Sequence, residues 1–292
     1  MLGPEQLRKI RTIEFTTRRL LDDLMNGGYR SSFQGQGVQF SEHRVYVPGD
    51  DIRHIDWKVS ARTREPLVKK FEEERELSVL LVVDSSASLE FGSGERLKGE
   101  SAAEVAGMLA YAAAMSGDKT GLLLFSEQVE KVLPLRKGKN HVSRILRELI
   151  EHRPRARGTG ISAALETAGR VMKHKGIVIV VSDFIDEQYE ISLRRLARRH
   201  DVVAIQVSDR LEAGLPRAGL LRVVDPESGT EHVIDPASYS FQKWLDGFHQ
   251  RHRTDTDSAW QSGRVDSLRI DTVQDPSEAL VKFFTARARR RR

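Results

Sequence analysis

Four continuous apolar runs restrict the possible folds of this chain more than any other feature. They are LSVLLVVD (77–84), TGLLLFS (120–126), GIVIVVSD (176–183) and DVVAIQVSD (201–209). None alternates between apolar and polar residues, as a strand with one solvated face does. Each is therefore predicted to be a strand buried on both faces, the kind found in parallel sheets that helices cover on both sides.

Helical patterns separate these runs. Helices are predicted at 96–115, 141–152, 162–173 and 189–199. An edge strand is predicted at 129–135, where Pro134 can be tolerated because an edge strand leaves one side unpaired. Strands that alternate with crossover helices predict an α/β fold with a doubly wound, mostly parallel sheet and helices on both faces. In this sheet, 77–84 is expected to be central.

The remaining segments lie on either side of this core. The first thirty residues are predicted to form a helix that ends at Gly27-Gly28, and Gly35-x-Gly37 is interpreted as a turn. After the fourth run, the patterns predict a hairpin at 220–235, a helix at about 237–262, a strand at 265–272 and a helix at 275–290. Three parts are expected: an N-terminal helical and β extension (1–75) packed on the sheet domain, the sheet domain (76–285) and a basic tail (286–292).

Composition excludes several classes of protein. The 292 residues include no cysteine, which excludes a disulfide framework, a thiolate metal site and a thiol nucleophile. No apolar run approaches the roughly 18 residues of a membrane span, and the N-terminus lacks the apolar segment of a signal peptide. We therefore expect no membrane span and a cytoplasmic location.

The net charge of +5 comes from the end of the chain. Without the five arginines at 287 and 289–292, basic and acidic residues balance at 42 each. A neutral body predicts no sequence-specific nucleic-acid binding. The arginines are interpreted as a solvated end, with contact to acidic lipid or nucleic acid as the alternative.

Polar residues follow the apolar runs, at the positions where ligands bind in open α/β sheets. The first run is followed by a D-x-S-x-S pattern, the third ends in an aspartate, and a threonine precedes the helix at 162–173. The candidate site residues are Asp84, Ser86, Ser88, Thr159 and Asp183. Hydroxyl and carboxylate oxygens suit a hard cation, Mg²⁺ or else Mn²⁺ or Ca²⁺. With only two carboxylates the ion would stay electron-poor and attract an acidic group from a partner. The alternative is that these are capping and turn residues.

This set resembles the metal-ion-dependent adhesion site of von Willebrand factor A domains, at all five positions. A second motif, PGDD-x-R-x-IDW, lies upstream and is followed by Ser60-Ala61-Arg62. Its residues are Pro48, Gly49, Asp50, Asp51, Arg53, Asp56, Trp57 and Arg62. Together the two motifs resemble the von Willebrand A-like proteins associated with MoxR-type AAA+ ATPases (domain of unknown function 58). The resemblance implies a von Willebrand A-like fold, a MoxR-type ATPase as partner, and a chaperone-like role in the maturation or assembly of client complexes.

The upstream motif has two interpretations. In the first, Ile52, Ile55 and Trp57 are buried against the sheet domain, and Arg53, Asp56 and Arg62 form a shielded ion-pair network. The motif would then lock the N-terminal extension onto that domain. In the second, it is a surface for contact with a partner.

The function expected from these features is a non-enzymatic, metal-dependent protein–protein interaction module. One alternative is a metal-dependent phosphatase or hydrolase that uses Asp84. Phosphatases of that kind carry a second aspartate two residues later, where this chain has Ser86. The other alternative is a metal-free structural domain. The chain has no G-x-x-x-x-G-K-[ST] pattern, so ATP hydrolysis by the chain itself is not expected.

Overall fold

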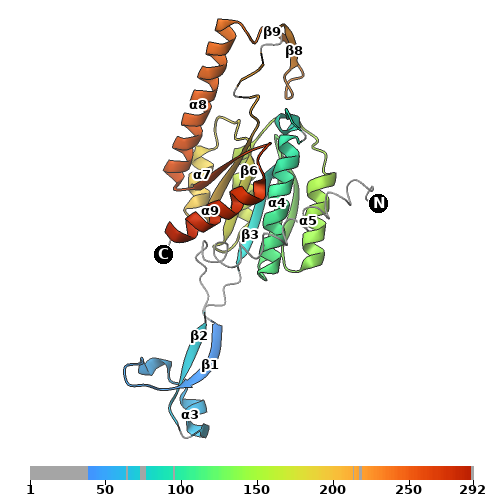
Figure 1. Ribbon diagram of the computed structural model, residues 1–292. Helices are drawn as coiled ribbons and strands as arrows, with labels where there is room; N and C mark the ends of the chain where they lie inside the picture. The colour runs from blue at the N-terminus through green and yellow to red at the C-terminus, as the bar shows by residue number, and fades with distance from the viewer. Residues whose placement is uncertain are drawn as a thin grey trace. The chain divides into compact units, whose positions relative to one another are not determined.

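The computed structural model describes residues 39–63, 65–72, 77–94, 96–212, 214–216 and 219–290 (Figure 1). The chain divides between Leu77 and Ser78 into a small N-terminal unit and a large unit. The predicted N-terminal helix and the Gly35-x-Gly37 turn lie outside the described residues. The two units are described separately below.

A six-stranded sheet forms the centre of the large unit. Its strands are β3 (Ser78–Asp84), β4 (Lys119–Phe125), β5 (Val129–Arg136), β6 (Ile177–Ser182), β7 (Asp201–Ser208) and β10 (Asp266–Asp271). They lie in the order β10-β7-β6-β3-β4-β5, and all neighbours are parallel except β4 and β5. The predicted mostly parallel sheet is confirmed, with β3 inside it and β5 at an edge.

Helices cover both faces of this sheet. They are α4 (Lys98–Met115), α5 (Lys139–Glu151), α6 (Ile161–Val171), α7 (Glu190–Ala197), α8 (Tyr239–Gly263) and α9 (Pro276–Arg290). Helices α6, α7 and the end of α8 pack on one face, where alternate strand residues such as Leu80, Val82 and Val180 form a fully buried core. Helices α4, α5 and α9 lie together on the other face (Figure 1). Both faces of the sheet are therefore buried under helices, as the continuous apolar runs predict.

The order of the strands reverses beside β3. From β3 the chain proceeds to β4 and β5 in one direction, whereas β6, β7 and β10 extend from the opposite side of β3. In open α/β sheets the crevice at such a reversal, outside the carboxyl ends of the strands, is where ligands bind. The end of β3 and the end of β6 therefore frame the candidate site.

Helix α9 continues into the segment predicted to be a tail. The Arg287 side chain is only 1% exposed, and it donates hydrogen bonds to Asp201 and to Asp266, the latter over 2.7 Å between Nε and Oδ2. These aspartates begin β7 and β10. The prediction of a solvated end is therefore wrong for Arg287, because two carboxylates at the amino ends of neighbouring strands bind its guanidinium.

A separate hairpin lies between β7 and β10 in the sequence. Its strands, β8 (Leu221–Val224) and β9 (Glu231–Ile234), pair antiparallel and form a sheet of their own, as predicted. In the part of the chain that the structure describes, no helix combines the length and apolarity needed to cross a membrane.

The small unit contains the PGDD-x-R-x-IDW motif. Strands β1 (Gln39–Val45) and β2 (Leu67–Glu72) pair antiparallel, and between them lie a short 3₁₀ helix, η1 (Ile52–His54), and helix α3 (Trp57–Thr63). Gly49, at a φ of 113°, allows the turn in which Asp50 donates its backbone N–H to the Val47 carbonyl over 3.0 Å. The Asp50 carboxylate also accepts two hydrogen bonds from Arg44, at 2.6 and 2.7 Å, which fix the turn to β1.

Within the small unit, two apolar side chains of this motif are exposed. Trp57 is 69% exposed and Ile52 is 63% exposed, because a two-stranded sheet and one short helix offer too little surface to cover them. The charged side chains of the motif form local ion pairs: Arg53 pairs with Asp51 at 2.8 Å, and Asp56 pairs with His43 at 3.1 Å. Packing of the motif on the sheet domain stays a prediction.

One buried carboxylate joins the loops at the rim of the large sheet. Asp209, directly after β7, accepts hydrogen bonds from the backbone N–H groups of Ser93 and Leu211, at 3.0 and 2.9 Å, and from the Thr272 hydroxyl at 2.6 Å. Burial raises the pKa of this carboxyl group, but the hydrogen bonds from Ser93, Thr272 and Leu211 outweigh it and lower the pKa to about 2.

We expect this lowered pKa to make the fold sensitive to acid. The hydrogen bonds to the ionised Asp209 carboxylate stabilise the folded state by about 2 kcal/mol. This stabilisation is fully present above the unfolded-state pKa of about 3.9, and it is lost as the pH falls towards the folded-state pKa of about 2. Asp209→Asn should lower the free energy of unfolding at pH 6. Between pH 5 and pH 2, the free energy of unfolding of this variant should decrease less than that of the wild type. Urea unfolding followed by circular dichroism measures both. Identical pH profiles for the two proteins would contradict the prediction.

Candidate metal centre

The D-x-S-x-S residues form a tight turn at the end of β3. Asp84 is the last residue of the strand, and its Oδ1 accepts a hydrogen bond from the backbone N–H of Ser86 over 2.8 Å. The Ser85 backbone N–H donates to the Phe125 carbonyl over 2.7 Å, which ties the turn to the end of β4. Beyond the turn, 3₁₀ helix η2 (Ala87–Glu90) places Ser88 beside Ser86. All three candidate side chains of this turn are buried.

The two serine hydroxyls are spaced as ligands of one ion would be. Ser86 Oγ and Ser88 Oγ lie 3.0 Å apart. In an octahedral magnesium site with bonds of roughly 2.0–2.1 Å, neighbouring oxygens are separated by about 2.9 Å. Both hydroxyls can therefore bind the same cation with little rearrangement.

The second carboxylate reaches this turn through an unusual backbone conformation after β6. The Ser182 hydroxyl donates to Asp84 Oδ2 over 2.6 Å and accepts from the Phe184 N–H over 2.9 Å. Phe184 has a φ of 60°, which is uncommon for a bulky residue. Its ring is held by Tyr189 and Trp260, at centroid distances of 5.7 and 5.4 Å. This packing supports the strained turn that directs Asp183 to the edge of the sheet.

Asp84 and Asp183 interact in a dry environment. Burial, followed by the repulsion of the Asp183 carboxylate, raises the pKa of Asp84 to about 7. Asp84 is 3% exposed, so water screens this repulsion little. A site of this kind favours a cation that would stabilise the ionised form of both groups.

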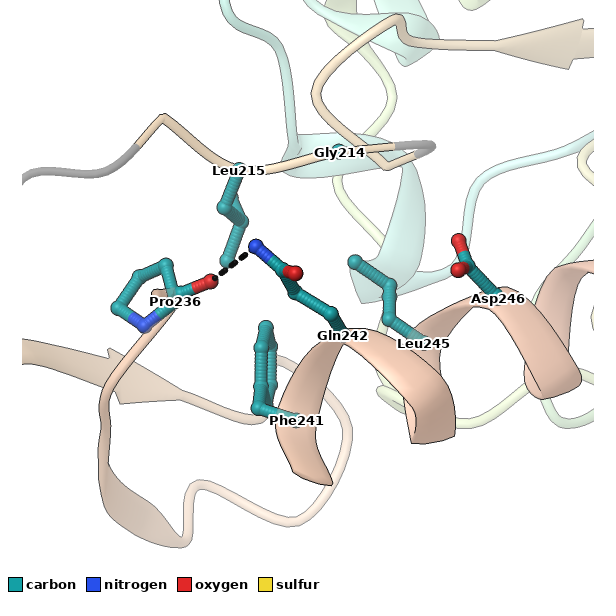
Figure 2. Close-up of a pocket in the computed structure, with 7 residues that line it drawn as sticks. All are labelled: Gly214, Leu215, Pro236, Phe241, Gln242, Leu245 and Asp246. Atoms are coloured by element: carbon teal, nitrogen blue, oxygen red, sulfur yellow. Dashed lines mark hydrogen bonds between the residues drawn. The ribbon is translucent and has the colours of Figure 1, made fainter. Parts of the chain in front are cut away.

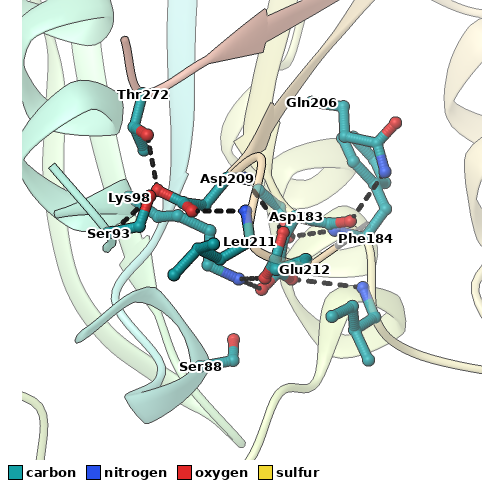
Figure 3. Close-up of polar contacts among 12 residues, drawn as sticks. Ser88, Ser93, Lys98, Asp183, Phe184, Gln206, Asp209, Leu211, Glu212 and Thr272 are labelled. Atoms are coloured by element: carbon teal, nitrogen blue, oxygen red, sulfur yellow. Dashed lines mark hydrogen bonds and ion pairs between the residues drawn. The ribbon is translucent and has the colours of Figure 1, made fainter. Parts of the chain in front are cut away.

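A lysine supplies part of that positive charge. Lys98, the first residue of α4, is 1% exposed, and its Nζ lies 2.9 Å from Asp183 Oδ2 and also binds Glu212 (Figure 3). Burial lowers the pKa of Lys98, but its two carboxylate partners outweigh burial and raise it. Glu212 is in turn fixed by the Asp209 backbone N–H, 3.0 Å from its Oε2. Neither Lys98 nor Glu212 belongs to a recognisable sequence motif.

Thr159 lies on a loop that adjoins the serine turn, directly before α6. The Arg157 carbonyl accepts from the Ala87 N–H over 3.0 Å, so the two loops are joined. A side chain at Gly160 would place its Cβ 2.3 Å from the Glu127 carbonyl oxygen, so glycine is required for this close approach. The Thr159 hydroxyl donates to Glu227 Oε1 over 2.9 Å. The structure thus brings Asp84, Ser86 and Ser88 beside Asp183. The Thr159 hydroxyl is instead directed at Glu227, which the sequence analysis did not select as a site residue.

The charges of these side chains fit a divalent cation at the serine turn. Of the three carboxylates gathered here, Asp183 and Glu212 bind the Lys98 ammonium, whereas Asp84 accepts hydrogen bonds from the Ser86 N–H and the Ser182 hydroxyl. In the described ranges, no three His, Cys, Asp or Glu side chains gather as metal ligands. Binding would therefore depend on the hydroxyl pair together with Asp84, which are three of the five residues in the predicted donor set.

A pocket elsewhere in the large unit is separate from these residues. It has a volume of about 170 Å³ and lies between the loop at 214–215 and the start of α8, where Gln242 donates to the Pro236 carbonyl over 3.2 Å (Figure 2). Its lining includes none of the five candidate site residues. The candidate centre is instead a cluster of side chains at the edge of the sheet.

Loss of the buried lysine should have a large effect on stability. Lys98→Met leaves the Asp183 and Glu212 carboxylates without their shared cation, which we expect to cost about 3–5 kcal/mol. Lys131→Met is the matched control, because Lys131 forms a partly exposed ion pair with Glu148 at 3.5 Å and should cost less than about 1 kcal/mol. Urea unfolding measures both values. Equal costs for the two variants would contradict the structural role of Lys98.

Comparison with known proteins places the chain in a family. An uncharacterized protein of Mycobacterium tuberculosis is 31% identical over 294 residues, covering 98% of this chain and 91% of that protein. The uncharacterized protein YeaD of Bacillus subtilis is 28% identical over 106 residues, covering 36% of this chain and 24% of that protein.

Among solved structures, the crystal structure of the conserved hypothetical protein BatB from Bacteroides thetaiotaomicron has a TM-score of 0.51 at 18% identity, covering 73% of this chain and 99% of that chain. This likeness concerns the fold, which is a central, mostly parallel sheet flanked by helices and is consistent with a von Willebrand A-like fold. The model of the family described as "Protein of unknown function DUF58" matches residues 42–255, so the chain belongs to the DUF58 family.

Proposed function

We propose that this protein is a non-enzymatic interaction module that binds an acidic group of a partner protein through a divalent cation. The observation that carries the proposal is the Ser86–Ser88 hydroxyl pair, 3.0 Å apart, beside two buried carboxylates at the point where the strand order reverses. The resemblance to the metal-ion-dependent adhesion site supports the same assignment.

Each side chain has a definite part in this proposal. Ser86 and Ser88 hold the cation, which we infer to be Mg²⁺ or else Mn²⁺ or Ca²⁺, with their hydroxyl oxygens. Asp84 is oriented towards them by the hydrogen bonds from Ser182 and from the Ser86 N–H. Lys98 restrains Asp183 and neutralises its charge. The bound ion supplies the excess positive charge that attracts an acidic group.

The proposed partner is a MoxR-type AAA+ ATPase, with a client complex whose maturation or assembly the two proteins assist. Membership of the DUF58 family and the resemblance to MoxR-associated proteins support this pairing. The exposed Ile52 and Trp57 of the small unit favour the second interpretation of the upstream motif, a surface for partner contact. We place this activity in the cytoplasm.

An enzymatic role for Asp84 is less well supported by the contacts. Its Oδ1 accepts from the Ser86 N–H and its Oδ2 accepts from the Ser182 hydroxyl. A nucleophilic carboxylate needs an accessible oxygen for attack, and Asp84 is 3% exposed. A phosphatase assay with a general aryl phosphate is expected to give no turnover above the background.

Three serines of one turn allow a matched test. Ser86→Ala and Ser88→Ala each remove a proposed ligand and should weaken Mg²⁺ binding roughly tenfold or more. Ser85→Ala is the control, because the Ser85 hydroxyl donates to the Phe125 carbonyl over 2.8 Å and so is already engaged at the end of β4. Isothermal titration calorimetry measures the affinity for Mg²⁺, and biolayer interferometry measures the affinity for the MoxR-type ATPase with and without EDTA.

We expect both affinities to fall together in Ser86→Ala and Ser88→Ala, and EDTA to have the same effect on the wild type. If the ATPase binds all four proteins equally and EDTA changes nothing, the serine turn is structural and the proposed function is wrong.

A further inference from the structure

The tip of the β8–β9 hairpin is a rigid turn. The Asp225 carboxylate accepts hydrogen bonds from the Glu227 N–H over 3.0 Å and from the Ser228 hydroxyl over 2.6 Å. The Gly229 N–H donates to the Asp225 carbonyl over 2.8 Å, and Gly229 has a φ of 72°, which glycine adopts without strain. These contacts fix the backbone that presents the Glu227 side chain.

That side chain contacts Thr159, the fifth of the candidate site residues. Glu227 Oε1 lies 2.9 Å from Thr159 Oγ1, although the two residues are 68 positions apart. Thr159 is the fifth residue of the adhesion-site pattern, on the loop joined to the serine turn by the Ala87–Arg157 hydrogen bond. A carboxylate from another element is therefore held one hydroxyl away from the proposed ligands.

Glu227 adds an acidic side chain to an edge of the sheet that already carries several, although Arg157 also lies beside this turn, with Nη1 3.8 Å from the position of a Cβ built at Gly229. The same edge of the sheet already carries the carboxylates of Asp84, Asp183 and Glu212, with Lys98 as the ammonium that contacts two of them. A further carboxylate at this edge increases the repulsion between like charges. A divalent cation at the serine turn would reverse the sign of this interaction.

We propose that Glu227 is the chain's own acidic ligand for this metal centre. This inference rests on the proposed function, because Glu227 would take the place assigned there to the acidic group of a partner. A partner carboxylate must then displace Glu227, so the hairpin lowers the affinity for weak acidic ligands and sets a threshold for binding. Displacement need not disturb the central sheet, since β8 and β9 pair only with each other in the described structure.

Mn²⁺ binding to the full chain tests this inference, with acetate as a probe for the vacated position. Glu227→Ala should bind Mn²⁺ about tenfold more weakly than the wild type. Excess acetate, in place of chloride at matched ionic strength, should restore the affinity of Glu227→Ala and leave that of the wild type unchanged. Glu231→Ala is the matched control, because Glu231 lies on the same hairpin and pairs with Arg222. Its Mn²⁺ affinity should equal that of the wild type.

The outcomes separate this inference from the proposed function. If Glu227→Ala binds Mn²⁺ as tightly as the wild type or more tightly, or if acetate acts equally on both, Glu227 is not a ligand and the inference is wrong. The proposed function then still stands, provided that Ser86→Ala weakens Mn²⁺ binding. If the wild type binds no Mn²⁺ at all, both the function and the inference are wrong. Circular dichroism verifies that each variant is folded.

Discussion

The candidate centre depends on one buried charge interaction, the contact of the Lys98 ammonium with the Asp183 and Glu212 carboxylates. These three residues come from the start of α4, the end of β6 and the loop after β7, so a single ammonium connects three separate elements. Removing an ammonium from water is costly, and the cost is recovered only when good partners surround it. The ion pair therefore requires the carboxyl ends of β6 and β7 to lie close to α4, and this arrangement is the one that forms the crevice.

The same interaction limits what else can bind. Because Lys98 already neutralises one carboxylate, an incoming divalent ion meets only a partial excess of negative charge, together with two neutral hydroxyls. Such a site is expected to hold its ion less firmly than a cage of several carboxylates, as in calcium-buffering proteins. Under the proposed function, such reversible metal binding would suit a contact that forms and dissociates, and the acidic group of the partner would contribute substantially to the stability of the complex.

The sequence predicted the parts of this arrangement that depend on local patterns. Continuous apolar runs identified the buried strands, and the positions directly after them identified Asp84 and Asp183, because parallel strands bring their carboxyl ends to one edge. Lys98 and Glu227 could not be found in this way, since they meet their partners Asp183 and Thr159 across 85 and 68 residues and lie in no periodic pattern. Burial of Trp57 stays a prediction for a related reason: burial of an aromatic side chain depends on which distant segments cover it, and the small unit alone leaves Trp57 exposed. The direction of the Thr159 hydroxyl likewise depends on Glu227 of the β8–β9 hairpin. Local sequence patterns do not predict where this hairpin lies.

The connection between β7 and β10 is long and includes elements that lie outside the central sheet. These strands are parallel neighbours in the sheet, yet the chain between them contains the hairpin and the long helix α8 before it returns. Asp84, Asp183 and Glu212 lie at or just after the ends of β3, β6 and β7 in the central sheet. Glu227 alone comes from this excursion. Because β8 and β9 pair only with each other in the described structure, substitutions within the hairpin can change the residue that contacts Thr159 without altering the pairing of the central sheet.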